Sequence, residues 1–231
     1  MNSYLSQFAF GIYPYLCLAV FLLGSLVRFD REQYSWRSGS SQLLRAKRLR
    51  WGSNLFHVGI LLLFLGHLVG LLTPHAVYAR FISVEDKQLL AMAAGGVFGT
   101  LCFIGLTILI HRRLTDPRVR ATSSSMDIAV VILIWLQLVL GLISIYYSAG
   151  HPDGGVMLIL ADYCQRLLTF RALEVHALVG LPWVYKAHLV LGFTLFLVFP
   201  FSRLVHIWSA PVFYLLRPYQ LVRRRAAKRL T

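Results

Sequence analysis

Cysteine is scarce in this chain, and its placement excludes several classes of cofactor. The three cysteines, Cys17, Cys102 and Cys164, lie far apart in the sequence, so they provide neither a disulfide framework nor a cluster for iron and sulfur. The C-x-x-C-H motif for covalent haem attachment is absent. We therefore interpret the cysteines as small apolar packing residues, and we expect any haem to be b-type, held by ligation and packing.

Charged residues are also few, which indicates a membrane protein. Only 14% of the 231 residues are charged and 58% are hydrophobic, far from the composition of soluble domains. A membrane-spanning helix needs roughly 20 apolar residues, and five segments qualify: residues 8–27, 51–72, 89–110, 126–147 and 183–208. No basic residue precedes the first segment, so we interpret it as a permanent span rather than a signal peptide. The sequence predicts one all-α integral membrane domain over residues 1–231.

Acidic residues are the rarest charged class, nine against 23 basic ones, and the basic ones are unevenly distributed. Eighteen of the 23 lie in residues 28–50, 112–120 and 203–231. Because lysine and arginine gather in cytoplasmic loops, we expect the N-terminus outside and the C-terminus in the cytoplasm. Basic residues that flank helix ends also disfavour nucleic-acid binding. The basic tail, residues 209–231, is either a docking surface for a cytoplasmic partner or an anchor to lipid headgroups.

The longest outer connection runs from Ser148 to Pro182. Within it, Met157 to Phe170 has apolar residues at helical spacing, interrupted by three polar ones. This pattern predicts a helix at the outer membrane interface. The helix is either a lid near a quinone site or a structural support.

Four histidines within the spans are the main functional signal. His57 and His67 are ten residues apart in the second span, and His188 and His206 are eighteen apart in the fifth. Because the two spans run in opposite directions, His57 shares a depth with His206, and His67 with His188. Imidazole offers iron a neutral nitrogen, and ionisable residues inside a membrane are usually functional. The pattern predicts two haems in series, although satisfied polar histidines are the alternative.

The axial spacings of the two histidine pairs differ. They are roughly 15 Å on the second span and roughly 27 Å on the fifth at 1.5 Å per residue, and eighteen residues would place His188 and His206 on one helix face. We expect helix tilt and a kink at Pro200 to absorb the difference. Glycines at positions 59, 66, 70 and 192 would leave room for the macrocycles or serve helix packing. The other histidines, His75, His111, His151 and His176, fall at helix ends or in loops.

Several motifs together resemble one known family. They are "SNLFHVGILLLFLGH" (residues 53–67), "RLTDPRVRAT" (113–122), "HLVLGFTLFLVFPFSRLVHIWSAP" (188–211), "YQLVR" (219–223), "IYPY" (12–15) and "SWRSGSSQ" (35–42). In order and spacing they resemble the gamma subunit of membrane-bound respiratory nitrate reductase. The match covers nearly the whole chain and is weakest in the outer loop from Tyr146 to Tyr185.

The resemblance implies a dihaem cytochrome b of the bacterial inner membrane. Such a subunit oxidises quinol at the outer face and passes electrons to a cytoplasmic iron–sulfur (beta) subunit, which feeds a molybdenum catalytic (alpha) subunit reducing nitrate. The family's haem-ligating histidines fall on His57 and His206 for the inner haem, and on His67 and His188 for the outer haem. Its quinol-site lysine matches Lys87.

Several of these assignments keep an alternative. Lys87 is otherwise an interfacial lysine paired with Glu85 or Asp86. Arg112 and Arg203 on the cytoplasmic side are candidates for contacts with the propionates of the inner haem. Otherwise they are basic residues that only set the orientation of the chain in the membrane. The rival functions are a dihaem anchor of a hydrogenase, a formate dehydrogenase or a sulfur-metabolising complex, and a haem-free anchor or transporter component.

Overall fold

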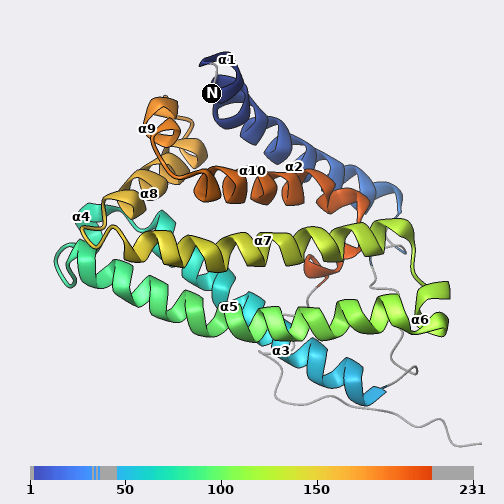
Figure 1. Cartoon of the computed structure of the whole chain (residues 1–231). Helices are drawn as coiled ribbons and strands as arrows, with labels where there is room; N and C mark the ends of the chain where they lie inside the picture. The colour runs from blue at the N-terminus through green and yellow to red at the C-terminus, as the bar shows by residue number, and fades with distance from the viewer. Residues whose placement is uncertain (1–2, 33, 35, 37–45, 210–231) are drawn as a thin grey trace, which may run out of the picture.

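The computed structural model describes residues 3–32, 34, 36 and 46–209, and every regular element within them is helical (Figure 1). The chain begins with α1 (Ser3–Gln7), a π-helical turn η1 (Phe8–Ile12) and α2 (Tyr13–Arg31). The other long helices are α3 (Ala46–Leu72), α5 (Val84–Thr115), α7 (Ser125–Ala149) and α10 (Trp183–Val198). The short ones are α4 (His75–Tyr78), α6 (Pro117–Ala121), α8 (Gly155–Leu168), α9 (Val175–Val179), and the 3₁₀ segments η3 (Phe199–Phe201) and η4 (Arg203–Ile207).

Five helical segments are long and apolar enough to cross a membrane, which confirms the predicted fold class. They are Tyr4–Arg31, Leu49–Leu72, Val84–Thr115, Ser125–Ala149 and Trp183–Phe201. The first four extend beyond the predicted apolar runs, and in α5 and α7 polar residues cap the helix start. Ser83 accepts a hydrogen bond from the Asp86 N–H at the start of α5, and Ser124 and Asp127 form a reciprocal capping box on α7. The tail after Ser209 lies outside the described residues.

The long helices contact one another in the order α2, α10, α7, α5, α3, a series that we call the row, and α3 crosses obliquely behind α5 and α7 in the view of Figure 1. Helices α2 and α10 run parallel, since Tyr13 hydrogen-bonds Thr194 while Gly24, further along, contacts Pro200. The remaining neighbours are antiparallel. We call the end that carries α4, α8 and α9 the α8 end, and the end that carries α6, η3 and η4 the α6 end (Figure 1).

The predicted helix in the outer loop is present as α8, close to the expected Met157–Phe170. Its buried residues include Val156, Tyr163 and Leu167, and the Tyr163 hydroxyl donates to the Phe10 carbonyl at 2.7 Å. Gln165 donates to the Leu71 carbonyl at the end of α3 at 2.9 Å. The first bond joins α8 to η1, next to α2, and the second joins it to α3, so α8 is held at both ends of the series of long helices. Burial raises the pKa of the Cys164 thiol to about 11, consistent with a packing cysteine.

Helices α3 and α5 pack closely through glycine. A Cβ at Gly59 would lie 2.6 Å from the Cβ of Cys102, and a Cβ at Gly105 would lie 2.4 Å from the backbone nitrogen of Phe56. Gly59 therefore serves helix packing, and the idea that it leaves room for a macrocycle is wrong. A Cβ at Gly66 or Gly70 would meet no atom within 4 Å.

The fifth span is not one continuous helix to residue 208. Helix α10 ends at Val198, η3 follows over Phe199–Phe201, and Ser202 is extended with φ −119° and ψ 177° before η4 begins. Pro200 has no N–H to continue the helical ladder. In place of the kink expected at Pro200, the α-helix is interrupted completely. The expectation that His188 and His206 share one helix face is therefore wrong.

Candidate haem-binding and quinol site

Two of the four predicted ligands, His67 and His188, face each other near the α8 end. His67 lies on α3 and His188 on α10, and their ring centroids are 6.3 Å apart with planes inclined by 28°. These residues are 121 positions apart in the sequence. The fold thus brings together the pair that membrane depth had matched, and not a crossed pair.

The spacing of this pair fits one metal ion held between two imidazoles. Bonds from imidazole to a metal are about 2 Å long, as at zinc, so an ion between two rings separates their nitrogens by about 4 Å and their centres somewhat more. The 6.3 Å centroid separation is compatible with this distance. Among the described residues no three His, Cys, Asp or Glu side chains gather as a metal site. A haem needs only two protein ligands, because the porphyrin supplies the rest.

The protonation pattern of three histidines also suits ligation. Nδ1 of His57 lies 2.7 Å from the Ser53 carbonyl, Nδ1 of His67 lies 2.7 Å from the Leu63 carbonyl, and Nδ1 of His206 lies 2.6 Å from the Arg203 carbonyl. A carbonyl oxygen only accepts hydrogen bonds, so Nδ1 carries the proton in each ring. The lone pair is then on Nε2, and such a bond to the backbone is the usual way of orienting a ligating histidine.

His188 has different surroundings. Its Nδ1 is buried without a hydrogen-bond partner, and its Nε2 lies 3.2 Å from Nε2 of Gln137. Gln137 also donates to the His188 carbonyl at 3.1 Å. Gly141 makes room for the ring, since a Cβ there would lie 3.1 Å from Cε1 of His188. Gln137 and Gly141 are thus the residues of α7 that hold this imidazole.

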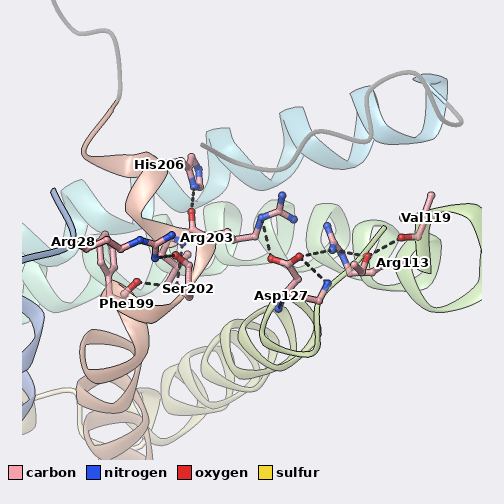
Figure 2. A network of polar contacts seen from close by, with 11 residues as sticks. Arg28, Arg113, Val119, Asp127, Phe199, Ser202, Arg203 and His206 are labelled. Atoms are coloured by element: carbon pink, nitrogen blue, oxygen red, sulfur yellow. Dashed lines mark hydrogen bonds and ion pairs between the residues drawn. The ribbon is translucent and has the colours of Figure 1, made fainter. Parts of the chain in front are cut away.

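The second pair, His57 and His206, lies towards the α6 end. His57 is on the exposed face of α3, and His206 is in η4 (Figure 2). Within the described residues their rings make no direct contact, in contrast to the outer pair. Their pairing at one haem stays a prediction.

The two arginines proposed for propionate contacts lie in different surroundings. Arg112 is buried near the end of α5, with 4% of its surface exposed. Arg203 forms an ion pair with Asp127, whose Oδ1 is 3.5 Å from Nε, and Asp127 also pairs with Arg113 at 3.7 Å (Figure 2). Both arginines are at the α6 end, as expected. Their contact with propionates stays a prediction.

Lys87 lies in the first turn of α5, buried, with 9% of its surface exposed. Its Nζ lies 3.5 Å from the centroid of the Tyr78 ring and has no hydrogen-bond partner. The expected alternative, a lysine paired with Glu85 or Asp86, is not what the structure has. The Asp86 carboxylate instead accepts from the Ser83 hydroxyl at 2.8 Å. A buried ammonium over an aromatic face is available to an incoming acceptor oxygen.

Tyr78 and Lys87 form one polar site. The Tyr78 hydroxyl is also buried without a partner, and burial raises the pKa of this phenol, so it remains a donor at neutral pH. Gly59 of α3 faces Cys102 of α5, and Phe56 faces Gly105, which defines the register of these antiparallel helices. In this register Lys87 lies about 10 Å further towards the α8 end than His67. The site thus lies between the His67–His188 pair and the α8 end.

Sequence reasoning missed Tyr78, Gln137 and Asp127. Gln137 did carry a signal, because it is an uncharged polar residue in the middle of an otherwise apolar span. Asp127 was visible as an acidic residue on the basic side. Tyr78 had no signal, since tyrosine is common at membrane interfaces.

Comparison with known proteins identifies a family. The family model described as "Nitrate reductase gamma subunit" matches residues 6–225. The chain is 51% identical to the respiratory nitrate reductase 1 gamma chain of Escherichia coli K12, over 96% of this chain and 99% of that one. It is 51% identical to the respiratory nitrate reductase 2 gamma chain of the same organism, over 97% and 100%. It is 35% identical to the nitrate reductase gamma chain of Bacillus subtilis 168, over 95% and 99%.

Proposed function

Since the chain belongs to the nitrate reductase gamma subunit family, we propose that it is a dihaem, quinol-oxidising cytochrome b. The general function follows from membership of the family. The chain is the membrane cytochrome b subunit of a respiratory nitrate reductase, an oxidoreductase complex of anaerobic respiration. It is a multi-pass protein of the inner membrane that works with the alpha and beta subunits and with the quinone pool.

The observation that carries the finer proposal is the spacing of His67 and His188. Their imidazoles would hold the outer haem, and those of His57 and His206 would hold the inner one. Bound haem supplies a one-electron carrier at each level. The backbone carbonyls behind Nδ1 of His57, His67 and His206 keep Nε2 of each ring free for iron. Arg112 and Arg203 would neutralise the propionates at the α6 end.

Quinol is the proposed electron donor, and Lys87 its proposed binding residue. The buried Nζ donates a hydrogen bond to a quinol oxygen, and the Tyr78 ring below it holds the ammonium in place. With the α8 end outside, as the positive-inside rule predicts, quinol oxidation there releases protons outside. Electrons then move inward to the beta subunit against a cost of about 2.3 kcal/mol per 100 mV for a full crossing.

The ligand assignment is tested by counting haems in the assembled complex. His188→Ala and His206→Ala should each reduce two b haems per chain to one, because each removes one of the two imidazoles that would hold a haem. His151→Ala, at a histidine in the loop after α7, is the matched control and should keep both. Haem content and the reduced-minus-oxidised spectrum give the answer. Full haem content in either ligand variant would contradict the assignment.

The quinol site has its own test, Lys87→Ala. This variant should oxidise quinol poorly, with both haems retained, because Lys87 is not a ligand. Reduction of nitrate with an artificial donor that feeds the cytoplasmic subunits should be unaffected. Normal quinol oxidation, or loss of a haem, would require the site to be moved.

A further inference from the structure

The α6 end carries a polar network that includes His206 but is not explained by haem ligation alone. It joins the end of α2, the end of α5, the start of α7 and the segment after α10 (Figure 2). The residues involved are Arg28, Asp127 and Arg203, together with the backbone of Pro200 and Ser202.

His206 lies in a short irregular segment that follows the end of α10. Helix α10 ends at Val198, Ser202 is extended, and η4 is a five-residue 3₁₀ helix. Short 3₁₀ helices have poor hydrogen-bond geometry and depend on their surroundings. The break also removes helical partners from backbone carbonyls in this segment. The direction of the His206 ring therefore depends on contacts made with other helices.

Arg28 supplies the first of these contacts. Its Nη1 donates to the Pro200 carbonyl at 2.6 Å and to the Ser202 carbonyl at 2.9 Å. One guanidinium thus fixes both sides of the break to α2. Bonds from a charged donor are roughly twice as strong as neutral ones. Gly24, one turn earlier on α2, allows the close approach, because a Cβ there would lie 2.8 Å from Cγ of Pro200.

Asp127 supplies the second contact. It is fixed in the capping box of α7, where its Oδ2 accepts from the Ser124 N–H at 3.1 Å, and its Oδ1 lies 3.5 Å from Nε of Arg203. The carbonyl of the same Arg203 accepts from Nδ1 of His206 at 2.6 Å. The residue that orients the imidazole is therefore itself held by α7 through its side chain and by α2 through the preceding carbonyl.

We propose that Arg28 and Asp127 are positioning residues for the inner haem, which fix η4 so that His206 presents Nε2 to the iron. They act through the Pro200, Ser202 and Arg203 backbone and do not touch the iron. This inference rests on the proposed function, since it assumes that His206 is a haem ligand. Changes in such outer partners typically weaken metal binding about 10- to 100-fold.

The test uses conservative variants in the complete membrane-bound complex. Arg28→Lys keeps the charge but shortens the side chain and replaces the guanidinium whose Nη1 donates both bonds. Asp127→Asn keeps the size and an acceptor oxygen but removes the charge that pairs with Arg203. Arg31→Lys and Asp30→Asn are the matched controls, because both residues are exposed at the end of α2. The measurements are the haem content, the midpoint potential of each haem, and the low-spin ferric EPR signal.

In Arg28→Lys and Asp127→Asn the inner haem should change its EPR signal and midpoint potential, or be lost, while the outer haem keeps both properties. The two controls should match the parent protein. Unchanged inner-haem properties in both variants would overturn the proposal, as would equal damage to both haems, which would indicate a general role in the fold. His206→Ala distinguishes failure of the proposed function from failure of this inference. If the His206→Ala complex keeps two haems, His206 is not a ligand, and the positioning role proposed for Arg28 and Asp127 fails as well.

Discussion

At the scale of single residues, the most informative contacts are those behind the imidazole rings. In three of the four candidate ligands a carbonyl one turn earlier fixes the Nδ1 proton, and in His188 it does not. There the ring is held by Gln137 and by the room that Gly141 leaves. The outer site therefore depends on α7 as well as on the two helices that carry its ligands.

Gly141→Ala should disturb the outer haem only. A Cβ at this position would lie 3.1 Å from Cε1 of His188, so the ring must rotate or shift by a few tenths of an ångström. We expect a shifted EPR signal and midpoint potential for the outer haem, with the inner haem unchanged. Gly95→Ala is the control, because its Cβ would meet only Cδ1 of Ile145 at 3.7 Å. Identical spectra for the two variants would show that Gly141 does not set the His188 orientation.

Tyr78→Leu should weaken quinol binding by removing the ring below Lys87. A desolvated cation–π contact is worth about 2 kcal/mol, which corresponds to a rise of roughly 10- to 30-fold in the quinol KM. Tyr78→Phe keeps the ring and separates its effect from that of the buried hydroxyl. Steady-state quinol oxidation gives the KM, and haem content serves as the control for folding. If the Leu variant kept the parent KM, the contact would have no part in quinol binding.

At the scale of helices, tight packing of α3 on α5 sets the position of His57 and His67. Gly105→Ala should destabilise the protein by about 1–3 kcal/mol, since its Cβ would lie 2.4 Å from the Phe56 backbone nitrogen and the helices must separate. Gly96→Ala is the matched change on the same helix, where a Cβ would meet no atom within 4 Å. Thermal unfolding monitored by the haem spectrum compares the two. Equal melting temperatures would contradict this account of the interface.

The sequence predicted helices well and their interruptions less well. Long apolar runs give the five spans because spanning the bilayer demands both length and internal hydrogen bonding. Pro200 predicted a disturbance, but the sequence after it, with Ser202 and Arg203 before further apolar residues, does not indicate whether an α-helix resumes. The answer depends on Arg28, which lies 172 residues before Pro200 and binds the carbonyls at the break. Such long-range contacts also explain why Tyr78 and Asp127 were missed.

At the scale of the whole molecule, the charge distribution predicts the orientation in the membrane. Eighteen of the 23 basic residues lie in residues 28–50, 112–120 and 203–231, which the positive-inside rule predicts to be cytoplasmic. A green fluorescent protein fused after Thr231 should fluoresce, because it folds in the cytoplasm, and alkaline phosphatase at the same point should be inactive. The same two reporters placed after Ala172, between α8 and α9, should give the opposite result. An active phosphatase after Thr231 would reverse both the topology and the assignment of inner and outer haems.

The order of the helices in space differs from their order in the chain, and this bears on how the protein is made. Helices α3, α5 and α7 are neighbours in the order of their synthesis, so each can pack as it enters the membrane. Helix α2 is made first, yet its long-helix neighbour is α10, which is made last and lies between α2 and α7 (Figure 1). We therefore expect α2 to lack its α10 contact in the membrane during translation until α10 is inserted. The ribosome must release residues 183–201 before the row closes, and assembly is completed by its last helix.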